Sequence, residues 1–302
     1  MGDKLSDVFL QLFCEKNSDG TKHLRLKGKD LYQRIGLDLS YNDIGDEGME
    51  ILAQNYLHEQ NNLKHLNLMH CDIGPEGMKF LSSSDFLMLE TCRINGNKLG
   101  PSGARHIGSL INRCPTLLHI DIAETDLTLD SIESILIVIE GSTLKILDIS
   151  RIIPKSYYTK YDPATLADDL AVVLKHLEML DLGCNNMGDF GIQLIAIWLK
   201  SRPPLRALVV SGNNIKDYGA RALGFGLPFS KIRYLDISNN KIDDMGLMDL
   251  LDTIKKSSQL RLLYLWGNTF GPISCKGLPD NEPPRNQILL VCRNCGPATI
   301  VQ

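Results

Sequence analysis

Two groups of residues have side chains that could bind a metal ion or undergo redox chemistry. Cys292 and Cys295 form a C-x-x-C pair, which is half of a zinc site or a dithiol redox centre. No second C-x-x-C or H-x-H follows it, whereas a zinc site needs three or four protein ligands. His65, His70 and Cys71 are close in sequence, but the expected strand and turn should point His70 outward and Cys71 inward. We therefore predict no metal site and no cofactor.

The motifs that usually place catalytic residues are also missing from the sequence. It contains no G-x-x-x-x-G-K-[ST], no G-x-S-x-G and no H-E-x-x-H. No Ser/His/Asp or Cys/His set has a spacing that suggests catalysis. We therefore predict no catalytic residue and a protein that is not an enzyme.

A row of carboxylates could give the protein a negatively charged binding face. Five aspartates each lie between two leucine or isoleucine residues: Asp38, Asp121, Asp148, Asp181 and Asp236. If these triplets are neighbouring strands, the carboxylates point to one face and stand near one another. Such a row raises the local negative potential and could attract a basic partner. The alternative is that aspartate is simply common at this position and binds no ligand.

These aspartates belong to an internal repeat that covers most of the chain. The pattern L-x-x-L-x-L-x-x-N-x-L recurs at intervals of 26 to 29 residues, with one interval of 33. Its asparagine position falls at Asn42, Cys71, Asn97, Thr125, Ile152, Asn185, Asn213, Asn240 and Asn268. The paired leucines predict a short strand whose apolar side chains point inward. The asparagine amide can bond backbone groups that the following turn leaves unpaired.

An amphipathic segment follows each strand and predicts one helix per repeat. Clear examples are residues 44–54, 187–200, 215–227 and 242–256. Asp46, Asp189, Asp217 and Asp244 stand where an N-cap or first-turn acid belongs. A glycine two residues later should let the helix lie close to the strand loop. We predict an α/β solenoid shaped as a horseshoe, with parallel strands on the concave face and helices on the convex face.

The repeat also predicts the organisation of the chain into three segments. Residues 1–35 form an atypical N-terminal segment with a truncated first repeat, and residues 36–275 hold nine repeats. Residues 276–302 form an atypical tail that contains prolines and has no repeat frame. Capping of the solenoid could therefore be incomplete at both ends.

Two groups of aromatic residues are candidates for protein contacts. Tyr264 and Trp266 lie at the far end of the strand face, where such residues are typical interface anchors; alternatively, Trp266 covers the last repeat. The interval of 33 residues adds a loop at 154–163, and extra residues in a solenoid often lie on the binding face. This loop carries Lys155, Tyr157, Tyr158, Lys160 and Tyr161, which suit an acidic protein surface. A tolerated surface insertion is the alternative.

The long period and the G-D-x-G helix starts resemble the ribonuclease-inhibitor class of leucine-rich repeats. Four segments are similar to the leucine-rich repeat-containing protein thirty-four group of animals: GLDLSYNDIGDEG (36–48), KHLNLMHCDIGPEG (64–77), LYLWGNTF (263–270) and LDISRIIPKSYYTKYD (147–162). This resemblance implies a non-enzymatic protein of germ cells and ciliated cells, located in axonemes or in the nucleus.

Composition restricts the function further. The formal net charge of −4 argues against direct nucleic-acid readout, and no apolar run is long enough for a membrane span. Scattered cysteines without a secretory pattern favour an intracellular protein with reduced thiols. We predict a protein–protein interaction scaffold within a larger ciliary or axonemal assembly. The alternative is a soluble nuclear, nucleolar or cytoplasmic adaptor, or an inhibitor that binds a basic protein on the acidic concave face.

Overall fold

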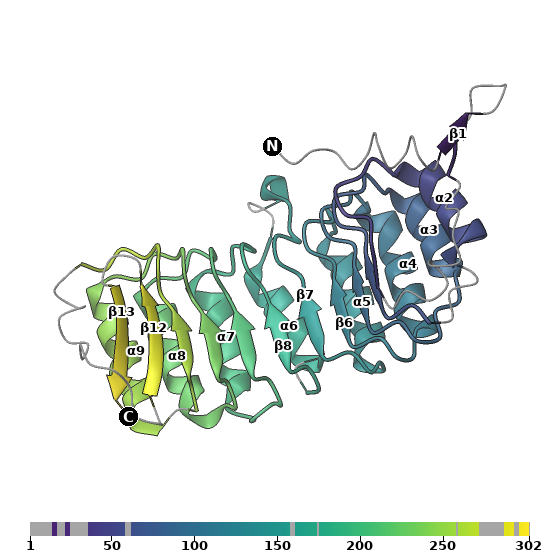
Figure 1. The fold of residues 1–302 in the computed structure, drawn as a ribbon. Coiled ribbons are helices and arrows are strands. Elements are labelled where there is room, and N and C mark those ends of the chain that lie inside the picture. Colours follow the sequence, from purple (N-terminus) through teal and green to yellow (C-terminus); the bar gives the residue numbers. More distant parts are fainter. Residues whose placement is uncertain are drawn as a thin grey trace. The chain divides into compact units, whose positions relative to one another are not determined.

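The computed structural model divides the chain into two compact units (Figure 1). Unit 1 comprises Met1–Leu144 with Ile152–Pro154, and unit 2 comprises Lys145–Arg151 with Lys155–Gln302. The structure describes residues 14–16, 22–24, 36–57, 62–157, 161–173, 175–257, 259–271, 287–292 and 296–301. Tyr158, Lys160 and Cys295, which the sequence singled out, lie outside these residues.

Unit 1 packs a layer of helices on one face of a parallel sheet. The strands, which pair in chain order, are β3 (Gly36–Asp38), β4 (His65–Asn67), β5 (Thr91–Arg93) and β6 (His119–Asp121). The helices are α2 (Gly45–Asn55), α3 (Pro75–Ser83), α4 (Gly100–Arg113) and α5 (Leu129–Glu140). A separate antiparallel pair, β1 (Cys14–Lys16) and β2 (Lys22–Leu24), lies within the atypical first 35 residues.

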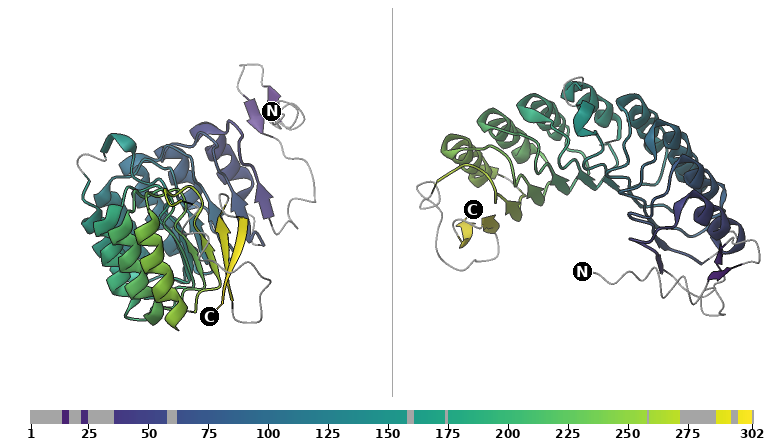
Figure 2. Two further views of the ribbon diagram at one scale, coloured as in Figure 1. Left: turned by 90° about the vertical axis from the view of Figure 1, so that its left-hand side faces the viewer. Right: turned by 90° about the horizontal axis from the view of Figure 1, so that it is seen from above.

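Unit 2 continues the same alternation of strand and helix. Its parallel strands are β7 (Ile146–Asp148), β8 (Met179–Asp181), β9 (Ala207–Val209), β10 (Tyr234–Asp236), β11 (Leu262–Tyr264) and β12 (Gln287–Cys292). Its helices are η2 (Lys155–Tyr157), α6 (Pro163–Val173), α7 (Gly188–Leu199), α8 (Asp217–Gly226), η3 (Leu227–Phe229) and α9 (Asp244–Ser257). Within each unit the helices cover one side of the strands (Figure 2).

The sheet of unit 2 extends into the segment that has no repeat frame in the sequence. Strand β12 pairs in parallel with β11, so that Leu263 faces Leu290. Strand β13 (Gly296–Val301) then returns antiparallel along β12. The polypeptide after residue 286 therefore lengthens the sheet beyond the last leucine-rich pattern. Among the described residues, no helix has both the length and the apolar composition needed to cross a bilayer.

The strands β3 to β11 are three residues long, and all except β3, whose Leu37 is only partly buried, bury their middle side chain. Leu66, Cys92 and Ile120 in unit 1, and Leu180 and Leu235 in unit 2, are all buried. Because side chains alternate along a strand, the first and third residues point away from the helices. We call the surface that these residues form the strand face of each unit.

Where the repeat has asparagine, its side chain completes the turn after the strand, as the sequence predicted. Asn97 Oδ1 accepts hydrogen bonds from the backbone N–H groups of Cys71 and Ile73, each at 3.0 Å. Its Nδ2 donates to the carbonyls of Leu68 at 2.8 Å and Ile94 at 2.7 Å. Asn185, Asn213, Asn240 and Asn268 use their side-chain amides in the same way. Adjacent repeats are thus joined by buried amide groups.

Three repeats replace this asparagine. Cys71 donates from Sγ to the carbonyl of Leu39 at 3.0 Å, so the thiol takes over part of the amide's role. Thr125 donates from Oγ1 to the carbonyl of Ile122 at 2.6 Å. Ile152 has no polar side chain, and it lies in the segment where the two units divide.

The aspartates at the helix starts serve the next repeat rather than their own helix. The prediction that they lie in the first turn is confirmed. Asp46 Oδ1, however, accepts hydrogen bonds from the N–H groups of Gly74 at 2.6 Å and Gly77 at 2.8 Å, at the start of α3. Asp189 Oδ1 likewise accepts from Lys216 at 2.7 Å and Gly219 at 3.0 Å, at the start of α8. The helices α3 and α8 thus receive an N-terminal cap from the preceding repeat, whereas α5 is capped by its own Thr128.

The recurring glycine makes room for this carboxylate. A Cβ on Gly77 would lie 2.6 Å from Asp46 Oδ1, and one on Gly219 would lie 2.7 Å from Asp189 Oδ1. Real Cβ atoms do not approach an oxygen so closely, so an alanine would displace the cap. The expected approach of helix to strand loop is therefore only part of the reason for glycine here.

Candidate functional site

The strand face of unit 2 presents an apolar row beside a row of aspartates and a tyrosine. The register aligns the first strand residues as Ile146, Met179, Ala207, Tyr234 and Leu262. It aligns the third residues as Asp148, Asp181, Val209, Asp236 and Tyr264. Neighbouring strands lie about 4.8 Å apart, so side chains in each row can contact the same partner group.

All five predicted aspartates have a structural partner in the turn that follows. In each case Oδ1 accepts a hydrogen bond from the backbone N–H two residues later, at 2.8 to 3.1 Å. The acceptors are Asp38, Asp121, Asp148, Asp181 and Asp236. This Asx-type bond explains why the repeat favours aspartate at this position without a ligand.

The carboxylates do not form one continuous row. In unit 1 the third strand positions run Asp38, Asn67, Arg93 and Asp121, so a neutral amide and a cation separate the two acids. In unit 2, Asp148 and Asp181 are direct neighbours, while Val209 separates Asp181 from Asp236. The negative charge of the strand face is therefore less interrupted in unit 2 than in unit 1.

Local contacts keep Asp38 ionised. Partial burial raises its pKa, but hydrogen bonds from Ser40 and Asn67 and the positive charge of Arg93 outweigh burial and lower the pKa below its ordinary value. The Ser40 hydroxyl donates to Oδ1 at 2.6 Å. This acid is thus paired within its own unit, which leaves less of its charge for a partner.

Two tyrosines meet on the strand face of unit 2, and only one of them was predicted. Tyr264 and Tyr234 have ring centroids 5.4 Å apart and planes tilted by 45°. Burial, together with the negative charges of Asp236 and Asp181 and the electrostatic influence of the Tyr264 phenol, raises the pKa of Tyr234 to about 12. The pair therefore stands among carboxylates. Tyr234 opens the triplet Tyr-Leu-Asp, so the alternation of the strand could have identified it.

Trp266 lies two residues after Tyr264 and is partly buried. Its backbone carbonyl accepts a hydrogen bond from Asn239 N–H at 2.7 Å. The residue is therefore only partly exposed, and a partly exposed tryptophan is a frequent interface anchor.

The inserted loop is described only in part. Lys155 is exposed and begins the short helix η2, whose last residue is Tyr157. Tyr161 is partly buried, with its hydroxyl 3.2 Å from Met187 Sδ. The structure thus places Tyr161 against the start of α7, where it stabilises the repeat.

The candidate metal ligands of the second repeat point in different directions, as predicted. Cys71 is buried, whereas His70 is exposed and stacks on Tyr41 with ring centroids 5.1 Å apart. His65 Nδ1 lies 3.2 Å from the hydroxyl of Thr91. Within the described part of the chain, no three His, Cys, Asp or Glu side chains are placed to hold a metal ion.

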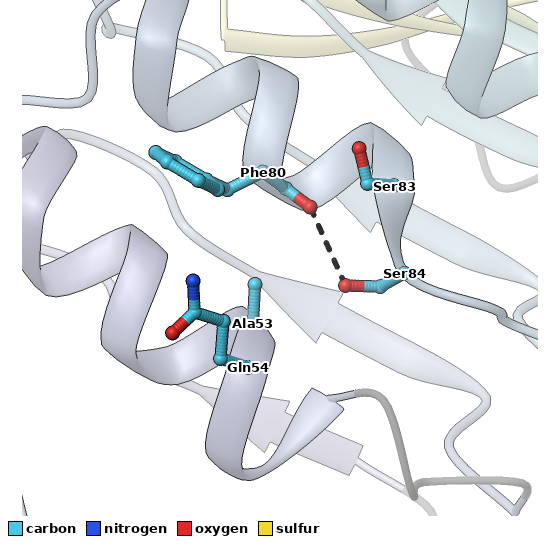
Figure 3. A pocket seen from close by; sticks show the side chains of 5 residues that line it. All are labelled: Ala53, Gln54, Phe80, Ser83 and Ser84. Carbon is cyan, nitrogen blue, oxygen red and sulfur yellow. Dashed lines mark hydrogen bonds between the residues drawn. The ribbon is translucent and has the colours of Figure 1, made fainter.

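Shallow hollows occur between neighbouring helices of unit 1. One of about 350 Å³ lies between α2 and α3 and is lined by Ala53, Gln54, Phe80, Ser83 and Ser84 (Figure 3). Its lining has no charged group, and the Ser84 hydroxyl already donates to the carbonyl of Phe80 at 3.5 Å. A second hollow of about 430 Å³ lies between α4 and α5. Its Arg113 is paired with Asp85. The first hollow lacks the convergent polar groups of a small-molecule site, whereas the lining of the second also includes Arg105, Ser109, Asn112 and Ser134.

Comparison with known proteins agrees with this architecture. The family model described as "Leucine Rich repeat" matches residues 37–53, 59–82, 173–196, 203–224 and 230–251. The ribonuclease inhibitor of Sus scrofa is 27% identical over 227 residues, which cover 73% of this chain and 42% of the relative. The chain therefore spans less than half the length of that relative.

The similar solved structures have low sequence identity to this chain and low TM-scores. The leucine-rich repeat-containing protein LegL7 from Legionella pneumophila is 16% identical, with a TM-score of 0.44, covering 87% of this chain and 84% of that chain. Human 5T4 (Wnt-activated inhibitory factor 1, trophoblast glycoprotein) is 17% identical, with a TM-score of 0.40, covering 61% of this chain and 62% of that chain.

Proposed function

We propose that this leucine-rich repeat protein is a non-enzymatic binding module that holds another protein on the strand face of unit 2. One observation carries the proposal: the apolar first-position row lies beside Asp148, Asp181, Asp236 and the Tyr234–Tyr264 pair. Apolar and aromatic area supplies affinity, and carboxylates favour a basic partner. The pig relative is named as an inhibitor of ribonuclease, itself a protein, which supports a protein as the partner.

The insertion at 154–163 is proposed as a second contact. Lys155, Tyr157, Tyr158, Lys160 and Tyr161 combine cationic and aromatic side chains, which suit an acidic surface on the same partner or on a neighbour. The exposure of Lys155 supports this role. Tyr161, which contacts Met187, would anchor the loop rather than touch the partner.

The proposed setting is a larger assembly in the cilium, with this chain as a structural scaffold of the axoneme. The resemblance of segments 36–48, 64–77, 147–162 and 263–270 to the protein thirty-four group supports this setting. The second candidate is a soluble nuclear or cytoplasmic adaptor or inhibitor of a basic protein. The acidic strand face of unit 2 and the similarity to ribonuclease inhibitor favour that candidate.

Charge-removing variants test the strand face without disturbing the fold. The triple variant Asp148→Asn, Asp181→Asn, Asp236→Asn keeps the oxygen that accepts each backbone N–H, so the turns stay intact. A matched control removes three exposed charges from the helix side: Glu133→Gln, Glu140→Gln and Asp168→Asn. Tagged wild-type and variant proteins are cross-linked in ciliated and germ cells, and partners are identified and mapped by mass spectrometry.

The triple variant should lose about tenfold or more of the captured partner, while the control should retain it. Equal capture by both variants would show that the strand face of unit 2 is not the binding site. Axonemal partners that cross-link at Lys155 would favour the scaffold. A soluble basic partner, released by salt, would favour the inhibitor.

A further inference from the structure

The helix side of unit 2 carries an exposed apolar surface that the strand-face proposal does not use. We define the helix patch by six residues of three consecutive helices: Phe190 and Ile197 on α7, Tyr218 and Phe225 on α8, and Met245 and Met248 on α9. Their exposure ranges from 45% for Met248 to 67% for Tyr218. Because α7 packs against α8 and α8 against α9, we treat these exposed apolar side chains as one surface rather than as scattered single residues.

The patch is not a general property of the repeat. Phe190, Tyr218 and Met245 occupy one repeat position, between the first-turn aspartate and the recurring glycine. The same position in unit 1 holds Glu47 in α2 and Glu76 in α3, both exposed. The two units thus share one backbone plan, but only unit 2 places apolar side chains at this site.

The spacing of the residues makes the patch broad. Phe190 and Ile197 are seven residues apart on α7, and Tyr218 and Phe225 are seven apart on α8, so each pair shares one helix face about 10 Å long. Neighbouring packed helices lie 8–10 Å apart, roughly the same distance. From their exposed fractions, the six side chains present about 700 Å² of mainly apolar area.

This area is close to what a stable protein interface needs on each side. A standard interface buries about 800 Å² per partner, whereas the largest apolar patch of a monomer is typically about 300–600 Å². The exposed area of these six residues alone is larger than the largest apolar patch of a typical monomer. An interface of full size is therefore expected here.

The charged groups of the patch carry both signs. Arg221 lies with its guanidinium carbon 5.8 Å from the centre of the Tyr218 ring and pairs with Asp249 at 2.5 Å. Asp252 is exposed three residues further along α9. Because Arg221 and Asp249 neutralise each other, the pair leaves the apolar area without a strong charge that would repel an identical surface, as the interface of a two-fold dimer requires. We propose that the helix patch binds a second copy of this chain.

The mass of the full chain in solution tests the proposal, by sedimentation equilibrium across a dilution series. Wild-type protein should approach twice 33.7 kDa as concentration rises. Phe225→Asp and, separately, Ile197→Asp place a charge in the centre of the apolar contact and should leave a monomer. Ile137→Asp is the matched control, because Ile137 on α5 of unit 1 is similarly exposed, at 64% against 56% for Ile197. Circular dichroism checks that all variants stay folded.

A dimer that is lost in both patch variants and kept in the control would support the proposal. A wild-type monomer at every concentration would overturn it, as would a dimer that survives Phe225→Asp and Ile197→Asp. Cross-linking of the patch to a different protein by a monomeric chain would also overturn it. The test needs no strand-face partner, so its outcome is independent of the proposed function.

Discussion

Asp189 and Gly219 belong to successive repeats and depend on each other. The carboxylate of Asp189 accepts the backbone N–H of Gly219 at 3.0 Å, and a Cβ on Gly219 would stand 2.7 Å from the same oxygen. The N-cap residue of α8 is Lys216, whose side chain makes no capping bond. The helix therefore begins with a cap that comes from the repeat before it.

Removing this cap should destabilise unit 2. Asp189→Ala leaves two helix-initial N–H groups without their carboxylate and should lower the free energy of unfolding by about 1–2 kcal/mol. Gly219→Ala should cost about 1–3 kcal/mol because the new methyl group displaces the carboxylate. The double variant should cost less than the sum, since both changes remove one interaction. Urea denaturation measures all three, and additive costs would contradict the shared contact.

The matched control is Asp130→Ala. Asp130 is also a first-turn acid, and its exposed side chain caps no later helix in the described part of the chain. This variant should change the free energy of unfolding by less than about 0.5 kcal/mol. An equal effect at both positions would mean that the helix dipole, rather than the inter-repeat cap, explains the aspartates.

Asn213 should matter more to stability than Thr125, which fills the same repeat position. Asn213 Oδ1 accepts from the N–H groups of Asn185 at 2.9 Å and Met187 at 3.2 Å, and its Nδ2 donates to the carbonyl of Leu182 at 2.9 Å. Asn213→Ala leaves these buried groups unpaired and should cost roughly 3 kcal/mol or more. Thr125→Ala removes one described hydrogen bond and should cost about 1 kcal/mol. Thermal or urea unfolding of the two variants gives the comparison, and equal costs would contradict it.

The pKa of Tyr234 gives a pH dependence with a defined sign. Burial and neighbouring negative charges raise this pKa from 10.0 to about 12. The neutral phenol therefore stabilises the fold fully below pH 10, and this contribution is lost as pH rises from 10 to 12. Ultraviolet titration of tyrosinate, compared with Tyr234→Phe, should show one tyrosine that ionises near pH 12.

Asp236→Asn should lower the pKa of Tyr234, because one of the negative charges that raise it is removed. The shift should be partial, since burial is the largest cause. A Tyr234 pKa that does not respond to this substitution would show that the two side chains do not interact. A basic partner on the strand face should lower the same pKa further.

The cysteines should react with alkylating reagents in a fixed order. Burial raises the pKa of Cys71 to about 11 and of Cys114 to about 12, and it also raises the pKa of Cys92. The thiolate is the reactive form, so these thiols should resist iodoacetamide at neutral pH. Cys184 is partly exposed and should react first among the four whose side chains are described. Mass spectrometry of the folded protein tests this order, and denaturant should abolish it.

Much of the fold could be predicted from the sequence, because one local rule recurs. Leu66, Cys71 and Ile73 each have a fixed place in the pattern, and the structure buries all three. The partners of Asp46 and Asp189 could not be read in the same way. In the sequence, an acid that caps its own helix cannot be told from one that caps the next helix, because both stand in the first turn. Which helix receives the cap depends on how closely the next repeat packs, and the sequence of one repeat does not show this.

The candidate site was less accessible to sequence reasoning. A search for Leu-Asp-Leu triplets finds only the strands that carry aspartate. It therefore misses Arg93 and Val209, which occupy the same third strand position on strands that lie between the aspartates. Tyr234 was overlooked because its role depends on a diagonal contact with Tyr264 across two strands. Such contacts arise from packing between repeats, which the pattern of a single repeat does not contain.

The two kinds of polar bond between repeats run in opposite directions along the chain of unit 2. Asp189 supplies the helix that follows it, whereas Asn213 supplies the turn that precedes it. Asp217 in turn accepts from the N–H of Asp243, so it occupies the same place one repeat later. Deleting one whole repeat would place an equivalent helix start next to the capping aspartate and an equivalent turn next to the asparagine of the following repeat. Deleting any other number of residues would leave these groups out of register. The chain could therefore have grown or shortened during evolution by entire repeats, with every new junction already compatible.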